Sequence, residues 1–85
     1  LGVDSFSLEA GLSTPSVEEA STNQVMISRA REVYAVFDSS KLNKRSLAFI
    51  STLDKIGTVI TDNRLPAGVR NQLKAMGIEV ETVAV

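Results

Sequence analysis

Four consecutive residues, Asp38-Ser39-Ser40-Lys41, combine a carboxylate, two hydroxyls and an ammonium. An ammonium can contact a phosphate, and serine hydroxyls can donate hydrogen bonds to its oxygens. The same residues also fit a surface Asp–Lys pair, worth about 0.2–1 kcal/mol, beside serines that cap a turn. The residue types alone therefore leave an anion-binding and a purely structural interpretation open.

The position of this cluster in the predicted fold adds to its interest. Asp38 follows the most strand-like run, residues 33–37, and Asp4 and Asp62 each follow another predicted strand. The carboxyl ends of parallel strands meet at one edge of the sheet, where open α/β folds bind ligands. We therefore expect the three acids along one edge. Asp after a strand is also a common turn-forming or capping residue, and that interpretation stays open.

The hydrophobic pattern predicts strands and helices in alternation. The expected elements are a strand end at 1–4, a loop at 5–16, a helix at 17–31, a strand at 33–37, a short strand at 47–50, a helical turn at 53–55, a strand at 56–61, a helix from Pro66 to a stop at Gly77, and an edge strand at 78–85. This order predicts an α/β fold, a Rossmann-like unit with a parallel sheet and right-handed crossovers. The continuous apolar run at 33–37 predicts a strand buried on both faces.

The first helix begins with a capping box, in which Ser16 caps the helix and Glu19 reaches back to it. At about 100° per residue, one broad apolar side emerges from the helical pattern. Its members are Val17, Ala20, Gln24, Met26, Ile27 and Ala30. Glu19 falls inside this apolar side together with Asn23, and a carboxylate that faces inward needs a partner.

The composition of the 85 residues excludes several kinds of chemistry. The chain has no cysteine and no histidine, so thiolate or histidine zinc sites, a cysteine nucleophile and a Ser-His-Asp triad are impossible within it. Its net charge of −1 predicts no direct binding of nucleic acid by this segment. We expect no metal, no cofactor and no membrane span, and neither a Gly-rich nucleotide loop nor a Walker motif is present.

Several short strings, taken in their order and spacing, resemble one known family. They are Gly2-Val3-Asp4, Gly11-Leu12-Ser13-Thr14-Pro15, Glu19-Ala20, Met26-Ile27, Asp38-Ser39-Ser40-Lys41 and Ile60-Thr61-Asp62. Together they resemble the carboxy-terminal effector domain of DeoR-family bacterial transcription repressors. The resemblance covers essentially all of the chain, and the combination is more specific than any single string.

The resemblance implies a repressor with an amino-terminal helix-turn-helix domain for DNA and a carboxy-terminal domain that senses a phosphorylated sugar or polyol. It implies a fold related to ribose-5-phosphate isomerase, a cytoplasmic location, and a dimer or tetramer. The helix-turn-helix and the first half of the sensor, with its phosphate-binding loop, are absent from these residues. The chain is therefore expected to be a single, partial effector-sensing domain.

The resemblance also names the site. It implies ligand-binding roles for Asp4, Glu19, Asp38 and Lys41, with no catalytic residue. The related isomerases carry a lysine before a glycine run, and Glu9-Ala10-Gly11 occupies that place here. Because proton shuttling needs all of its acid and base groups together, the missing lysine favours a sensor over an enzyme. A sugar-phosphate isomerase and a purely structural or oligomerisation module remain the alternatives.

Overall fold

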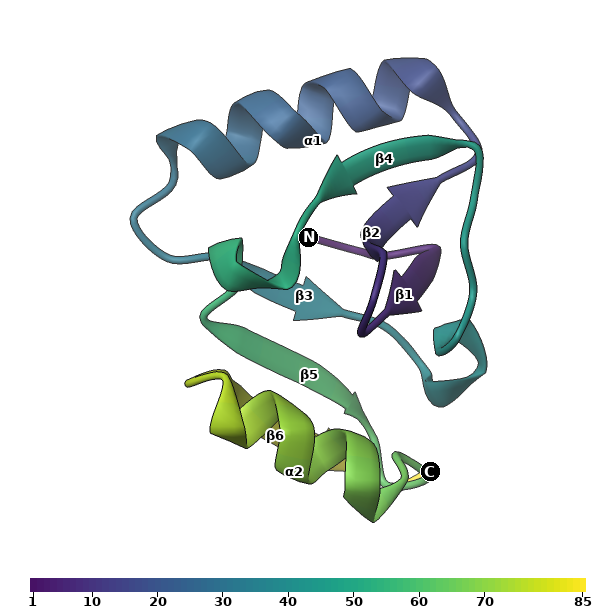
Figure 1. Ribbon diagram of the computed structural model, residues 1–85, viewed down its shortest axis with the longest axis vertical. Coiled ribbons are helices and arrows are strands. Elements are labelled where there is room, and N and C mark those ends of the chain that lie inside the picture. Colours follow the sequence, from purple (N-terminus) through teal and green to yellow (C-terminus); the bar gives the residue numbers. More distant parts are fainter.

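Two three-stranded sheets share one core, and each sheet carries one helix, in a computed structural model that describes residues 1–85 (Figure 1). The strands are β1 (Ser5–Ser7), β2 (Gly11–Thr14), β3 (Tyr34–Val36), β4 (Ala48–Ser51), β5 (Thr58–Asp62) and β6 (Glu79–Val83). The helices are α1 (Val17–Arg29) and α2 (Ala67–Ala75), with short 3-10 turns at Ser39–Lys41 and Leu53–Lys55. The predicted α/β class is confirmed.

The parallel sheet has the order β3-β5-β6. Val36 pairs with Ile60, which in turn pairs with Glu81. The first residues extend this sheet beyond β3, because the Val36 N–H donates to the Leu1 carbonyl at 2.8 Å and the Val3 N–H donates to the Val36 carbonyl at 3.1 Å. The predicted parallel sheet therefore exists, and β6 lies at its edge as expected.

The second sheet is antiparallel, in the order β1-β2-β4, and the predictions missed it in two places. Residues 5–16 were expected to be a loop, but β1 and β2 form a hairpin that buries Phe6 and Leu12 completely. The serines of this segment, together with Gly11 and Pro15, are typical of turns, and burial of the two large side chains overrides that signal. The short strand β4 was expected in the parallel sheet and pairs with β2 instead.

One core joins the two sheets. Phe6 of β1 stacks on Phe37, just after β3, with ring centroids 4.5 Å apart. Leu12, Val59 and Leu73 bring β2, β5 and α2 into the same buried cluster. The candidate site residues after β3 and around β2 are thus anchored on a shared apolar base.

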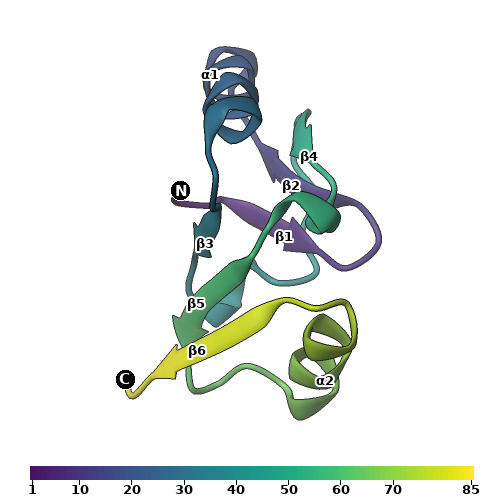
Figure 2. The same cartoon turned by 90° about the vertical axis from the view of Figure 1, so that its left-hand side faces the viewer.

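The expected burial of residues 33–37 on both faces is wrong in this chain. Ala35 is fully buried, but Tyr34 and Val36, on the opposite face of the sheet, are each 45% exposed. Right-handed crossovers that advance in one direction across a sheet all lie on one face. The chain advances from residues 1–3 through β3 and β5 to β6, and Figure 2 shows α2 and the β1–β2 hairpin on the same side of this sheet. The other face, which we call the open face and which includes Tyr34, Val36 and Val83, carries no layer.

The helices agree with the predictions in position and differ in burial. α1 ends at Arg29, two residues before the expected end, and packs on β4 and β2. Only Ala20 of its predicted apolar side is buried, whereas Val17 and Met26 are more than half exposed and Glu19 is exposed. α2 begins one residue after Pro66 and ends before Gly77, whose φ of +83° suits a glycine stop. Neither helix has the length and apolar character that crossing a membrane requires.

Gly11 is the glycine on which the hairpin depends. Its φ is +79°, and a Cβ there would lie 2.2 Å from the carbonyl oxygen of Ser51 on β4. We expect Gly11→Ala to lower the free energy of unfolding by more than about 2 kcal/mol, through backbone strain and the clash. Gly68→Ala, in an open part of α2, should instead raise it by about 0.5–1 kcal/mol. Urea denaturation of both variants measures the contrast, and equal effects would contradict this role of Gly11.

Candidate functional site

The register of the parallel sheet aligns three acids at its carboxyl edge. Gly2 bridges Val36, and Val36 pairs with Ile60, so the residues two positions further along each strand are level with one another. These are Asp4, Asp38 and Asp62. The prediction that the three acids lie along one edge of the sheet is confirmed.

Asp38 caps the 3-10 turn that contains Lys41. Its carboxylate accepts the backbone N–H of Ser40 at 2.9 Å and also the Ser40 hydroxyl. The hydroxyl bond of Ser40 is the main cause that lowers the pKa of Asp38, followed by the backbone bond, while the charge of Lys41 adds a smaller effect. Asp38 is therefore held as an anion at the start of the turn, with the half-buried Lys41 at its end.

Asp62 fixes this turn from the neighbouring strand. Its buried carboxylate accepts the Ser39 N–H at 2.8 Å and the Arg64 N–H at 2.9 Å. The bond from Ser39 is the largest cause that lowers the pKa of Asp62, against the opposing effect of burial. Asp62 was expected only to share the edge, and its role in holding the turn was missed. The signal in the sequence was its position directly after the predicted strand 56–61, at the edge shared with Asp38.

Asp4 and Glu19 meet at a third side chain. The hydroxyl oxygen of Thr14, at the end of β2, lies 3.0 Å from a carboxylate oxygen of Asp4 and 3.0 Å from one of Glu19. Ser16 caps α1 as predicted, since its hydroxyl accepts the Glu19 N–H at 3.2 Å. The predicted return bond of the capping box is wrong: the Glu19 carboxylate lies against the Thr14 hydroxyl, and the Ser16 N–H donates to the Thr14 oxygen at 3.5 Å instead. Sequence reasoning did not single out Thr14, because its partners depend on how β2 packs.

The predicted residues thus form two groups at one end of the fold. Asp38 and Lys41 belong to the turn after β3, and Asp4 and Glu19 share Thr14. Asp4 links the groups, because it is level with Asp38 across the Gly2–Val36 bridge. Carboxylates accept hydrogen bonds from hydroxyls, and an ammonium attracts an anionic group. The arrangement can therefore bind a molecule that carries both hydroxyls and an anion.

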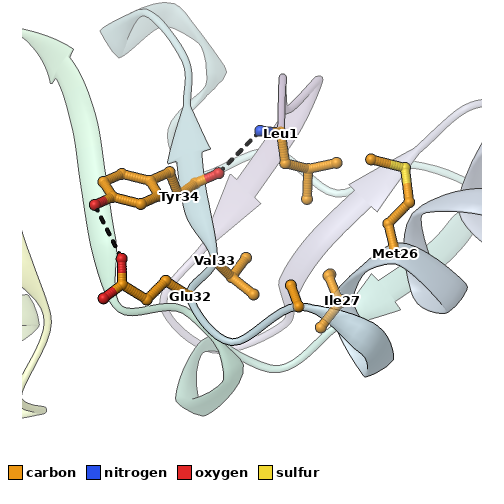
Figure 3. Close-up of a pocket in the computed structure, with 7 residues that line it drawn as sticks. Leu1, Met26, Ile27, Glu32, Val33 and Tyr34 are labelled. Carbon is orange, nitrogen blue, oxygen red and sulfur yellow. Dashed lines mark hydrogen bonds between the residues drawn. The ribbon is translucent and has the colours of Figure 1, made fainter.

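An apolar pocket lies away from these groups, between the end of α1 and the start of β3. Its lining includes Leu1, Met26, Ile27, Val33 and Tyr34 (Figure 3). Its volume of about 190 Å³ is below the roughly 300–1,000 Å³ of small-molecule sites. The amino group of Leu1 donates to the Tyr34 carbonyl at 3.0 Å at its rim, and the four predicted site residues take no part in it.

Comparison with known proteins identifies relatives that cover most of the chain. The family model of the DeoR C-terminal sensor domain matches residues 1–63. The "HTH-type transcriptional regulator GlpR" of Haloferax volcanii is 36% identical over 80 residues, which are 94% of this chain and 31% of that protein. A putative aga operon transcriptional repressor of Escherichia coli O157:H7 is 40% identical over 80 residues, 94% of this chain and 30% of that protein.

A shorter match extends the set of relatives. The lactose phosphotransferase system repressor of Staphylococcus epidermidis is 40% identical over 50 residues, which are 59% of this chain and 20% of that protein. The chain spans about a third or less of the length of the curated relatives it matches. The similarity therefore concerns one segment of longer transcriptional regulators.

The role of Asp62 predicts a specific response to acid. A depressed pKa contributes stability that is present above the ordinary value of 3.8 and is lost as the pH falls through the lower pKa of the folded protein. Asp62→Asn removes this contribution and sets an amide N–H against one backbone donor. We expect lower stability at neutral pH, a weaker loss of stability below pH 3.8, and faster amide exchange at Ser39.

Asp54→Asn is the matched control for this experiment. Asp54 is exposed, and the hydroxyl of Thr52 is the main cause that lowers its pKa. The substitution should also weaken the acid response, but it should leave the exchange of Ser39 unchanged, because Asp54 does not contact the turn at Ser39–Lys41. If Asp62→Asn leaves the exchange of Ser39 unchanged as well, Asp62 does not hold that turn.

Proposed function

We propose that this chain, which belongs to the DeoR C-terminal sensor domain family, binds a small phosphorylated sugar or polyol as the effector-binding part of a transcriptional repressor. The relatives that cover most of the chain are transcriptional regulators by name. One shorter match is named for a sugar phosphotransferase system. This supports an effector drawn from sugar metabolism.

The observation that carries the proposal is the alignment of Asp4, Asp38 and Asp62 at the carboxyl edge of the parallel sheet, where the turn after β3 also holds Lys41. Lys41 contacts the phosphate of the effector, and Asp4, Glu19 and Asp38 accept hydrogen bonds from its hydroxyls or orient the lysine. A polyol phosphate carries both kinds of group in one small molecule, which matches the two kinds of side chain. Binding shifts the repressor between two arrangements only by as much as the effector prefers one of them.

We also propose that the chain is the distal part of a larger sensor domain related to ribose-5-phosphate isomerase. Parallel sheets have both faces covered, and the open face around Tyr34 and Val36 lacks a second layer. Further strands beyond residues 1–3 that advance in the opposite direction would place their right-handed crossovers on this open face. Such an arrangement makes Asp4 a residue of the switch point between the two halves, where open α/β sheets bind ligands.

The remaining parts of the proposal concern the whole repressor. DNA binding belongs to an amino-terminal helix-turn-helix outside this chain, the repressor is a cytoplasmic dimer or tetramer, and its sensor does not catalyse turnover. The place of the isomerase lysine is held by Glu9-Ala10-Gly11, of which Glu9 and Ala10 lie in the turn from β1 to β2 and Gly11 begins β2. Glu9 is exposed there and supplies a carboxylate where an isomerase needs an ammonium. Steady isomerisation of ribose 5-phosphate by the intact protein would overturn the sensor proposal.

A thermal-shift panel tests the effector class. We expect one of ribose 5-phosphate, fructose 6-phosphate or glycerol 3-phosphate to stabilise the intact protein by about 2.7 kcal/mol at a concentration of about 100 times Kd. Lys41→Ala should weaken that binding by at least about tenfold, because a charged hydrogen bond is lost. Lys44→Ala, an exposed lysine of the next turn, is the control. Lack of any shift in the intact protein would contradict the proposed effector class, and equal effects of the two variants would exclude Lys41 from the site.

The proposed second layer on the open face has its own test. Val36→Lys in the intact protein should lower the free energy of unfolding by several kcal/mol, because it buries an unpaired ammonium. Met76→Lys is the control, because it introduces the same charge at a position that is 50% exposed at the end of α2, away from the open face. It should change the free energy of unfolding little. Tolerance of Val36→Lys would show that the open face stays in contact with water.

A further inference from the structure

We infer that Thr14 is the positioning residue that sets the hydroxyl specificity of the site, an inference that rests on the proposed effector-binding function. Its hydroxyl oxygen stands between Asp4 and Glu19, 3.0 Å from a carboxylate oxygen of each. The three side chains come from three separate segments: residues 1–4, which precede β1, the end of β2, and the first turn of α1. Thr14 therefore fixes a distance between two carboxylates that the backbone alone does not fix.

The Thr14 hydroxyl has one proton for two carboxylates. A threonine hydroxyl donates one hydrogen bond, and an ionised carboxylate only accepts. The Ser16 N–H, 3.5 Å away, also points to the Thr14 oxygen and is a donor, so it supplies no proton to either acid. One hydroxyl proton therefore serves one of the two carboxylates at a time. The other carboxylate oxygen is left with acceptor capacity that a hydroxyl of the effector can fill.

The surroundings keep Thr14 in place while they leave both acids accessible. Thr14 is only 1% exposed and pairs with Ala48 of β4, so its side chain is held by the antiparallel sheet. Asp4 and Glu19 are both exposed. A buried, fixed hydroxyl between two accessible carboxylates holds both acceptors in set positions for the hydroxyls of a bound polyol. Such preorganisation favours specificity.

The inference separates two ends of the effector. Lys41 and its turn recognise the anionic end, and Thr14 acts on the hydroxyl-bearing end through Asp4 and Glu19. Removal of the Thr14 hydroxyl should therefore reduce affinity for a sugar phosphate and leave affinity for inorganic phosphate unchanged. A residue that only supports the fold would weaken both probes together.

The experiment uses the intact protein and three variants. Thr14→Val removes the hydroxyl and keeps the shape, Thr14→Ser keeps the hydroxyl, and Thr22→Val makes the same change at an exposed position of α1. Calorimetry measures binding of inorganic phosphate and of whichever of ribose 5-phosphate, fructose 6-phosphate and glycerol 3-phosphate stabilises the unsubstituted protein. Circular dichroism and urea denaturation monitor the fold of each variant.

We expect Thr14→Val to weaken the sugar phosphate by at least about tenfold, with inorganic phosphate unchanged, and Thr14→Ser to retain most of the affinity. Thr22→Val should bind both probes as the unsubstituted protein does.

Equal binding of the sugar phosphate by Thr14→Val, or an equal loss for both probes, would overturn the inference and leave the proposed function standing. If Thr14→Val fails to fold, a Thr14→Ser variant with the discrimination of the unsubstituted protein still supports the inference, and one that loses discrimination overturns it. Absence of sugar-phosphate binding by the unsubstituted protein would instead overturn the proposed function.

Discussion

The site depends on the register between residues 1–3 and β3. Two main-chain bonds fix it, from the Val36 N–H to Leu1 and from the Val3 N–H to the Val36 carbonyl. Side chains alternate along a strand with a period of two, so a slip of one residue would turn Asp4 to the opposite face from Asp38. The pairing of β3 with β5 then brings Asp62 to the same level. A few backbone hydrogen bonds thus place acids from distant parts of the sequence at one edge.

A second constraint couples this edge to the hairpin. Phe6 and Phe37 stack at 4.5 Å, and Phe37 directly precedes Asp38. The same packing sets β1 and β2 against the parallel sheet, which brings Thr14 within hydrogen-bonding distance of Asp4. α1 follows Thr14 within three residues, so the position of Glu19 is set by the hairpin as well. The apolar contact under the site therefore determines the geometry of the polar groups above it.

Much of the parallel sheet could be predicted from the sequence because its signals are local. Apolar runs marked β3 and β5, and Gly77 marked the end of α2. The hairpin at residues 5–16 could not be predicted, because Phe6 and Leu12 are single large side chains among turn-forming residues and their burial depends on distant partners. The role of Thr14 could not be predicted for the same reason, because its two carboxylate partners lie in segments before and after it and meet it only in the folded chain. The exposed Tyr34 and Val36 contradict the expected burial because α2 and the β1–β2 hairpin of this chain both pack on the other face of the sheet.

The four acids of the site differ in how much of their hydrogen-bonding capacity the fold already uses. Asp62 accepts two backbone N–H groups and is buried, so its carboxylate serves the turn. Asp38 accepts from the backbone and the hydroxyl of Ser40, which leaves its second oxygen free. Asp4 and Glu19 share one hydroxyl proton and keep the most unused acceptors. Because like charges at one edge repel, the hydrogen bonds that Asp62 and Asp38 accept help to keep these two acids ionised. Under the proposed function, the unused acceptors of Asp4 and Glu19 are the ones that hydroxyls of the effector would fill. The acceptor capacity that the fold leaves unused therefore increases from Asp62 through Asp38 to Asp4 and Glu19.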